Sequence, residues 1–351
     1  MRSKTGFAGV VYAIGAAALF GASMPFAKQL LPSVGPVLMA GLLYLGSGLG
    51  LAFYRMARRS GTETEARLGR RDLPWLAGAI ACGGVIGPVL LMVGLSKTPA
   101  SNASLLLNLE GVFTVLLAWF AFKENFDRRI AWGVALITAG AFTLSWLGRP
   151  EIGVPWGALA ITGACLAWAV DNNLTRNVSA ADPVQIAMLK GLCAGAVNTC
   201  VALSLGARLP PPGRLAAVAV IGVLGYGVSL VLFILALRHL GTARTGAYFS
   251  LAPFVGAAVS ILCFHDSVTA GFMVAALLMA AGVWLHLTER HEHGHAHEAM
   301  DHEHLHNHDA HHRHAHGPND PPGEPHNHGH RHEPLTHAHP HYPDLHHRHD
   351  H

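Results

Sequence analysis

The chain has 351 residues, of which 51% are apolar and only 13% are charged, and its mean hydropathy is +0.33. A soluble protein normally carries about a quarter of its residues as Asp, Glu, Lys and Arg. The composition therefore excludes an ordinary soluble globular protein, and a net charge of +3 is too small to indicate nucleic-acid binding.

Ten apolar stretches are each long enough to cross a membrane, whose hydrocarbon core of about 30 Å needs roughly 20 residues of helix. The connections between them are short, so consecutive helices are expected to be antiparallel neighbours. The sequence predicts an all-α membrane protein with ten transmembrane helices, near residues 7–29, 34–55, 73–95, 100–122, 129–147, 154–174, 183–206, 213–238, 242–264 and 268–287.

The Lys and Arg residues predict how these helices are oriented, because cytoplasmic loops are enriched in both. With the N-terminus in the cytoplasm, the outer helix ends carry five of them: Lys28, Lys97, Arg149, Arg208 and Arg214. The inner ends carry fifteen: Arg2, Lys4, Arg55, Arg58, Arg59, Arg67, Arg70, Arg71, Lys123, Arg128, Arg129, Arg176, Arg238, Arg244 and Arg290. Both termini are therefore expected in the cytoplasm.

The chain also repeats itself. Residues 105–113 line up with 247–255 at an offset of 142, and residues 19–28 parallel 167–176 at an offset of 148. Five helices per repeat is an odd number, so the second half is expected to insert upside down, as in many secondary transporters. This predicts two inverted five-helix repeats, at 7–147 and 154–287, followed by a tail at 288–351.

Three motifs carry a family resemblance. They are Gly-Ala-Ser-Met-Pro-Phe-Ala-Lys at 21–28, Leu-Asn-Leu-Glu-Gly-Val-Phe at 107–113 and Ala-Trp-Phe-Ala-Phe-Lys-Glu at 118–124. With weaker echoes in the second half, they resemble the EamA family of the drug/metabolite transporter superfamily, over roughly residues 7–287. The resemblance implies a ten-helix secondary carrier in the inner membrane of a bacterium, often an exporter of amino acids or related metabolites.

The chain departs from the family pattern at Glu110-Gly111, where many relatives have proline in place of the glycine; only the second half keeps one, Pro253. The second block closes on Asp266 rather than glutamate. The chain contains no GxxxxGK[ST] loop, so we do not expect it to couple transport to ATP hydrolysis. As a secondary carrier it is expected neither to be an enzyme nor to require a cofactor.

Glu110 is the strongest candidate for a functional charge. It lies about ten residues into the fourth predicted helix, some 15 Å deep at about 1.5 Å per residue. An ionisable group at that depth costs about 2.5–3.5 kcal/mol to insert. With Asn108 nearby, Glu110 is suited to bind a substrate ammonium or to carry a coupling proton. A structural carboxyl that is hydrogen-bonded between helices is the alternative interpretation.

Lys190 lies about two turns into the seventh predicted helix, counted from Pro183. In one interpretation it faces a cavity and pairs with Glu110 or with a substrate carboxylate. In the other, its long stem lets the ammonium reach the cytoplasmic surface.

Asp171, Asn172 and Asn173 form a third polar cluster, near the inner end of the sixth predicted helix. Its partner in the repeat, Ser23-Met24-Pro25, is expected toward the outer end of the first helix. The cluster fits a gate or a binding-site element. Capping and interfacial solvation explain Asp171 equally well.

Two other residue types have expected structural roles. Trp168 and four further tryptophans fall mostly near helix ends, where they are expected to be interfacial anchors. Glycines such as Gly83 and Gly225 are expected to let helices pack closely.

The composition changes abruptly after Arg290. Only His239, His265 and His286 precede the tail, so 23 of the 26 histidines lie in it, together with many prolines. Large apolar residues are almost absent there. The tail is therefore expected to be disordered, because it cannot bury enough surface to offset its ordering entropy.

Alternating histidines with interspersed carboxylates predict multisite binding of Zn²⁺, Ni²⁺, Co²⁺ or Cu²⁺ by the tail. Such binding would be lost as imidazoles become protonated near about pH 6. The expected ligands are His291, His293, His295, His297, His302, His304, His306 and His308.

The sequence thus predicts a plasma-membrane secondary transporter that exports a small amino-acid-like or drug-like metabolite, with proton coupling as an option. The core histidines lie near helix ends and form no HxxxD or HExxH pattern, which disfavours a dedicated metal carrier. Metal-ion efflux with the tail as a loading arm, export of a metal-chelating metabolite, and a non-transporting membrane-tethered metal buffer stay open. A homodimer also stays open.

Overall fold

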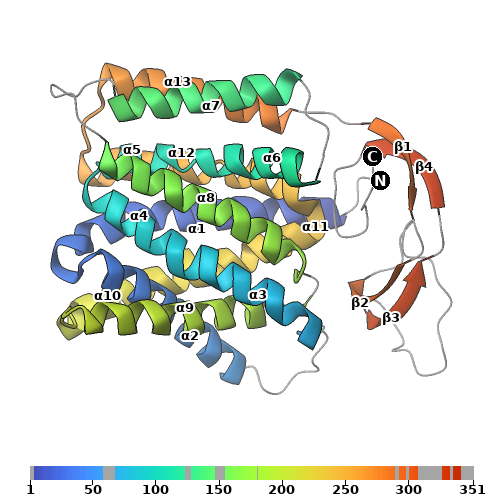
Figure 1. The fold of residues 1–351 in the computed structure, drawn as a ribbon, viewed down its shortest axis with the longest axis horizontal. Helices are drawn as coiled ribbons and strands as arrows, with labels where there is room; N and C mark the ends of the chain where they lie inside the picture. Colours follow the sequence, from blue (N-terminus) through green and yellow to red (C-terminus); the bar gives the residue numbers. More distant parts are fainter. Residues whose placement is uncertain are drawn as a thin grey trace.

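The structure is a computed structural model that describes residues 4–57, 68–122, 128–146, 155–179 and 181–288, together with four short strands between 292 and 340. The helices run roughly side by side in a bundle, and the strands lie beside one end of it (Figure 1). The first half comprises α1 (Lys4–Val34), α2 (Pro36–Ala57), the short η1 (Arg70–Asp72), α3 (Leu73–Ala79), η2 (Ile80–Ile86), α4 (Gly87–Ser96), α5 (Ala100–Leu106), α6 (Leu109–Phe122) and α7 (Arg128–Trp146). The second half comprises α8 (Trp156–Arg176), α9 (Pro183–Ser204), α10 (Pro212–Ile221), η3 (Gly222–Val228), α11 (Ser229–Phe249), α12 (Ala252–Phe264) and α13 (Ala270–Leu287).

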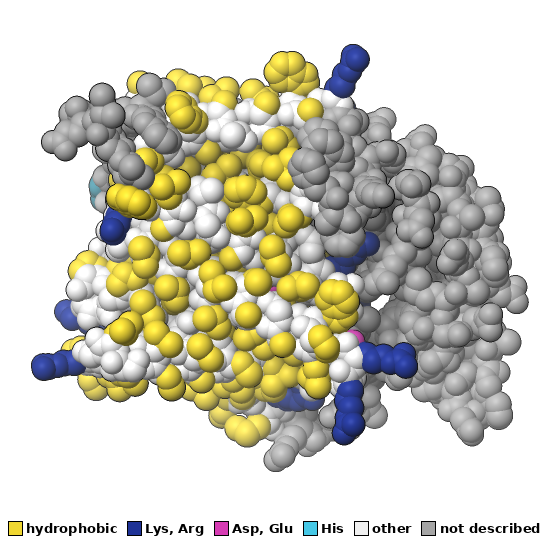
Figure 2. All heavy atoms as spheres, in the orientation of Figure 1, with side chains coloured by type: hydrophobic (Ala, Val, Ile, Leu, Met, Phe, Trp, Pro, Cys, Tyr) yellow, Lys and Arg dark blue, Asp and Glu magenta, His cyan; other side chains and the backbone are white. Residues whose placement is uncertain are grey.

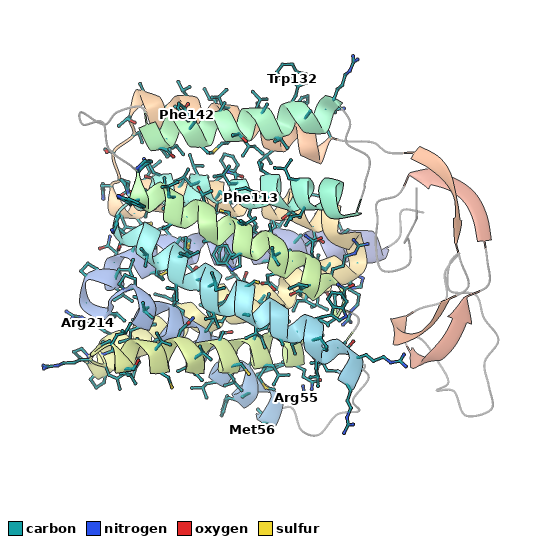
Figure 3. All side chains as sticks on the ribbon, viewed as in Figure 1. Arg55, Met56, Phe113, Trp132, Phe142 and Arg214 are labelled. Atoms are coloured by element: carbon teal, nitrogen blue, oxygen red, sulfur yellow. The ribbon has the colours of Figure 1, made fainter. Side chains whose placement is uncertain are left out.

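The surface of the bundle suits a hydrocarbon environment. Hydrophobic side chains cover the visible face, and Lys and Arg side chains project near its ends (Figure 2). Arg55 and Arg214, which the charge pattern assigns to opposite sides of the membrane, lie at opposite ends of the bundle (Figure 3). Trp132 and Phe142 on α7 are 66% and 60% exposed, as expected for side chains that face lipid rather than water.

Six described stretches are long and apolar enough to cross a membrane: Phe7–Val34, Pro36–Ala57, Arg70–Ser96, Pro183–Ser204, Pro212–Leu240 and Thr245–Phe264. Two shorter apolar helices, Ala131–Ser145 and Ala270–Leu285, accompany them. The expected fourth span is divided between α5 and α6, and the expected sixth, α8, carries polar residues at its C-terminal end. The number of ten spans therefore stays a prediction.

Helix α11 turns back on itself. A straight α-helix would separate Phe233 from Phe249 by roughly 24 Å, at about 1.5 Å per residue. Their ring centroids are only 4.9 Å apart. The segment therefore serves two of the predicted spans, near 213–238 and 242–264, rather than one.

The two halves contact each other through equivalent positions. A Cβ added to Gly15 would lie 3.3 Å from Leu232, and one added to Gly163 would lie 3.2 Å from Leu90. Gly163 follows Gly15 by 148 residues, and Leu232 follows Leu90 by 142, which are the two offsets found in the sequence. Each contact therefore has a counterpart in which the two halves exchange roles.

The contact between α7 and α13 also joins repeat-equivalent positions of the two halves. Gly140 lies against Met279 and the Ala275 carbonyl, and Gly282 lies against Ile137 and the Gly133 carbonyl. Each residue of the second contact is 142 positions from its equivalent in the first. In both contacts, a Cβ on the glycine would come within 2.7 Å of its nearest neighbour, so the missing side chain is what permits this approach.

Two π-helical segments, η2 and η3, interrupt equivalent helices of the two halves. They begin at Ile80 and Gly222, which again differ by 142 positions. In each segment the next amide bonds five residues back, from Gly87 to the Cys82 carbonyl and from Ser229 to the Leu224 carbonyl. Such insertions are rare and are frequent at functional sites.

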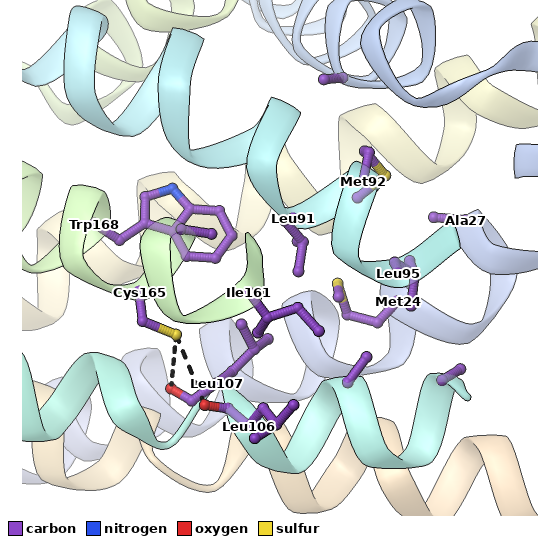
Figure 4. Packing of buried hydrophobic residues seen from close by; sticks show 14 of the residues in the cluster. Met24, Ala27, Leu91, Met92, Leu95, Leu106, Leu107, Ile161, Cys165 and Trp168 are labelled. Carbon is purple, nitrogen blue, oxygen red and sulfur yellow. Dashed lines mark hydrogen bonds between the residues drawn. The ribbon is translucent and has the colours of Figure 1, made fainter. Parts of the chain in front are cut away.

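The break between α5 and α6 removes the usual i+4 amide partners of the last carbonyls of α5, as at any helix end. The Leu107 carbonyl accepts from the Glu110 amide instead, at 3.0 Å. The thiol of Cys165 on α8 donates to the carbonyls of Leu106 and Leu107, at 3.7 and 3.9 Å (Figure 4). The break therefore packs directly against α8, which carries most of the polar residues discussed below.

The expected disorder of the whole tail is not confirmed. β1 (Glu292–His297) pairs antiparallel with β4 (Leu335–Pro340), and β2 (Met300–His306) pairs antiparallel with β3 (His326–His332). Strand pairing joins backbone groups, which nearly every residue carries, so a shortage of apolar side chains does not exclude it. Six of the eight expected metal ligands lie in β1 and β2, whereas His291 and His308 lie outside the described residues.

Candidate functional site

A cavity opens between helices of the two halves. Its space amounts to about 520 Å³, including the region that is open at its mouth. Segments α1, α2 and α6 of the first half and α8, α9, η3 and α11 of the second contribute side chains. The lining residues are Phe20, Tyr44, Glu110, Trp168, Asp171, Asn172, Lys190, Gly225, Tyr226, Ser229, Leu230, Phe233 and Phe249.

Lys190 and Asp171 form a buried ion pair in the cavity wall. Lys190 Nζ donates to Asp171 Oδ1 at 2.6 Å and to Oδ2 at 2.8 Å, and to Thr175 Oγ1 at 3.2 Å. Thr175 Oγ1 in turn donates to Asp171 Oδ1 at 2.8 Å. Lys190 is 1% exposed and Asp171 6%. The pair satisfies the rule that a charge removed from water needs an opposite charge and further hydrogen bonds.

This geometry corrects two expectations. Lys190 pairs with Asp171 rather than with Glu110, and its ammonium does not reach the cytoplasmic surface. Asp171 is likewise buried instead of solvated at a helix end. One face of α8 explains both results, because Asp171 and Thr175 are one turn apart there and both point toward α9.

Glu110 and Asn172 form the second polar contact of the cavity. Asn172 Nδ2 donates to Glu110 Oε1 at 2.6 Å, which joins α8 to the first turn of α6. Within the described part of the chain, no donor hydrogen-bonds the second carboxyl oxygen, Oε2. Glu110 lines the cavity and has one carboxyl oxygen without a hydrogen-bond partner among the described residues, as expected for a group that binds a ligand or a proton.

Two predicted residues lie elsewhere. Asn108 is buried at the break between α5 and α6, where its Nδ2 donates to the Leu105 carbonyl at 3.1 Å and contacts Met279 Sδ at 3.8 Å. The Nδ2 of Asn173 donates to the Ala169 carbonyl of its own helix. Neither lines the cavity. Asn108 lies in the break between two helices, and the side-chain amide of Asn173 is held against the backbone of its own helix.

Gly83 provides a carbonyl that organises the cavity wall. The Gly87 amide bonds the Cys82 carbonyl instead of Gly83, and Pro88, five residues after Gly83, has no N–H to donate. Tyr44 Oη and Trp168 Nε1 therefore donate to the Gly83 carbonyl, at 2.8 and 3.0 Å. The π-helical segment thus anchors the polar ends of two aromatic side chains.

Aromatic rings make up much of the remaining wall. Phe20 lies edge-on to Trp168 and Tyr226, with ring centroids 5.7 and 5.6 Å apart, and 5.6 Å from Phe249. Tyr226 also lies 5.4 Å from Tyr44. Among described side chains, none hydrogen-bonds the buried Oη of Tyr226.

The sequence alone did not indicate that Phe20, Tyr44, Trp168 and Tyr226 form an aromatic wall. Trp168, expected as an interfacial anchor, is only 7% exposed and bonds the Gly83 carbonyl inside the bundle. A signal was present, because Phe20 and Trp168 occupy equivalent positions of the repeat, 148 residues apart. Each also lies within four residues of the polar segment of its own helix.

The chain is similar to known proteins over most of its length. The model of the EamA-like transporter family matches residues 7–146 and again 155–288, which together make up most of the chain. The chain belongs to the EamA-like transporter family. It is also 29% identical, over 295 residues, to an uncharacterized transporter of Methanothermobacter thermautotrophicus (strain Delta H), covering 79% of this chain and 85% of that protein. A crystal structure of a protein that is 17% identical shares the fold, with a TM-score of 0.61 over 81% of this chain and 96% of the other.

Membership of the EamA-like transporter family identifies the chain as a membrane transporter protein. Each of the two family matches contributes to the cavity: Phe20, Tyr44 and Glu110 come from the first, and Asp171 and Lys190 from the second. The cavity therefore lies where a relative movement of the two matched halves would change its shape.

Proposed function

We propose that this protein is a secondary carrier for a small organic solute, that its two repeats are inverted, and that Glu110 couples transport to a proton. The observation that supports this most directly is the open carboxyl oxygen of Glu110 in a cavity built from both halves. A carboxyl in such a place can hold either a proton or a cationic group, so the two compete for it. Exchange across the membrane follows if the cavity opens to each side in turn.

The orientation of the chain in the membrane and the direction of transport belong to the same proposal. The charge pattern supports cytoplasmic termini in a bacterial inner membrane, with export as the physiological direction. An inward proton gradient would then drive the solute outward through Glu110.

Proteoliposomes that contain a pH-sensitive dye test the proposal. Outward gradients of a panel of amines, amino acids, sugars and organic acids are imposed in turn, and solute-dependent proton movement is recorded. We expect such movement with the wild-type chain and its loss in Glu110→Gln, whose amide still accepts the hydrogen bond from Asn172. The control is Asp72→Asn, because Asp72 accepts from the Gly69 amide in the turn before α3, outside the cavity. Absence of proton movement with every solute, or unchanged movement in Glu110→Gln, would overturn the proposal.

We further propose that the tail binds divalent transition metals at several sites. Its alternating histidines support this. Titration of Ni²⁺ into the full chain should show several sites, and a chain that ends at residue 290 should show none. If cells making the truncated chain keep full metal resistance, the tail is not a loading arm for metal efflux.

A further inference from the structure

The cavity contains three charged side chains, and two of them are already paired with each other. An ammonium has three N–H donors. Lys190 uses them on Asp171 Oδ1, Asp171 Oδ2 and Thr175 Oγ1. The lysine therefore has no donor left for a substrate carboxylate or phosphate, and both oxygens of Asp171 are occupied as well.

Glu110 is the remaining charge. Its Oε1 accepts from Asn172, and its Oε2 faces no donor among the side chains that the structure describes. When Glu110 is ionised, the described lining carries one uncompensated negative charge. An anionic solute would meet repulsion there with no free cation to offset it, whereas a cationic solute would find a carboxylate.

The uncharged part of the wall favours the same kind of ligand. The indole N–H of Trp168 and the hydroxyl of Tyr44 are both used on the Gly83 carbonyl, so neither is available to an anion. What these residues offer the cavity is aromatic surface, next to Phe20 and Tyr226. Aromatic faces attract ammonium groups, and quaternary ammonium ligands are recognised by such cages.

The hydroxyl of Tyr226 adds a polar contact. It is buried in the cavity wall and has no hydrogen-bond partner among the described residues. Buried hydroxyls normally have a partner. A hydroxyl oxygen accepts from an ammonium N–H, so a protonated amine would satisfy it. A quaternary ammonium, which has no N–H, would be held by Glu110 and the aromatic rings alone.

We propose that the carried solute is a small organic monocation, an amine or quaternary ammonium with an apolar or aromatic body, held by Glu110 and the aromatic wall. This inference rests on the proposed carrier function and names its substrate class. Exchange of one monocation for one proton on Glu110 moves no net charge. Transport should therefore respond to a pH gradient and not to a membrane potential.

Binding of radiolabelled benzyltrimethylammonium to the purified full chain tests the ligand class. We expect saturable binding that neither phenylacetate nor phenylalanine displaces at equal concentration. Glu110→Gln should weaken it at least tenfold, and Phe20→Leu several-fold. Phe53→Leu is the matched aromatic control, because Phe53 is 70% exposed near the end of α2. Displacement by phenylacetate, or unchanged affinity in Glu110→Gln, would overturn the substrate class.

Flux measurements separate this inference from the proposed function. Proton-coupled transport of an anion or a neutral solute, without competition from benzyltrimethylammonium, would refute the substrate class and leave the carrier function standing. Tight benzyltrimethylammonium binding without proton-coupled movement of any solute would keep the ligand class and refute the carrier function. Electrogenic transport of the cation would refute the one-for-one exchange.

Discussion

The two π-helical segments make equivalent contacts in different chemical surroundings. A Cβ on Gly83 would overlap the Asp171 carboxylate of α8, and a Cβ on Gly225 would overlap the side chain of Ser23 on α1. Asp171 is the repeat counterpart of Ser23, at the offset of 148. Each π-segment therefore touches the first helix of the opposite half at the same repeat position.

The polar groups do not follow this symmetry. In the first half, the equivalents of Asp171 and Thr175 at the offset of 148 are Ser23 and Ala27. Helices α2 and α9 begin at Pro36 and Pro183, an offset of 147, so the equivalent of Lys190 is Leu43. All three first-half residues are buried and uncharged. Glu110 and Asn172 correspond likewise to the buried Ala252 and Met24. These equivalent positions carry no charge, so we expect that the backbone arrangement does not require the ion pair or the Glu110 contact.

Loss of one partner of the ion pair should have the largest effect on stability. Lys190→Leu copies Leu43 and leaves Asp171 buried without a cation, which costs about 3–5 kcal/mol. The double variant Asp171→Ser/Lys190→Leu copies both first-half residues and should recover most of that loss. Unfolding in mixed detergent–SDS titrations measures the free energy of unfolding of the single and the double variant. A double variant as unstable as Lys190→Leu alone would show that the second half does not tolerate the uncharged side chains found at the equivalent positions of the first.

Asn172→Met, which copies Met24, should have the next largest effect. It removes the hydrogen bond to Glu110, and hydrogen bonds to charged groups contribute about 1.5–3 kcal/mol. The loss should shrink in a Glu110→Gln background, where the acceptor is neutral. The same unfolding titrations, arranged as a double-mutant cycle, measure this coupling. Strict additivity would contradict a direct Asn172–Glu110 interaction.

Gly83→Ala should destabilise the protein by about 1–3 kcal/mol through overpacking. Its new Cβ would push the Asp171 carboxylate away from Lys190. The substitution should cost less in the Asp171→Ser/Lys190→Leu background. Gly246→Ala is the control, because a Cβ there meets nothing within 4 Å. An equal cost of Gly83→Ala in both backgrounds would mean that the carboxylate is not what the new methyl displaces.

The smallest effects should come from two neighbouring tyrosines. Tyr44→Phe loses the hydrogen bond to the Gly83 carbonyl and should cost about 0.5–1.5 kcal/mol. Tyr226→Phe removes a hydroxyl with no partner among the described residues, and should be neutral or slightly stabilising in the ligand-free protein. Differential scanning fluorimetry compares the two. A larger loss in Tyr226→Phe would contradict the unpaired state of its hydroxyl.

The sequence located the polar residues of the cavity but assigned their contacts incorrectly. Glu110, Asp171, Asn172 and Lys190 were all identified because an ionisable or amide group inside an apolar helix is costly and needs a reason. The pairing of Lys190 with Asp171 was missed, since depth along a helix says nothing about which neighbour a side chain faces. Asn108 illustrates the same limit. It is only two residues before Glu110, yet its side chain hydrogen-bonds the Leu105 carbonyl and does not line the cavity.

The sequence by itself determined the membrane location, the helical class, and the internal offsets of 142 and 148. These follow from composition, run length and self-similarity, which are local properties of the chain. Only the tertiary structure decided that η2 and η3 are π-helical, that Gly83 presents a free carbonyl to Tyr44 and Trp168, and that Lys190 is fully occupied. These depend on how each helix is rotated against its neighbours, which small residues at the contacts set through packing.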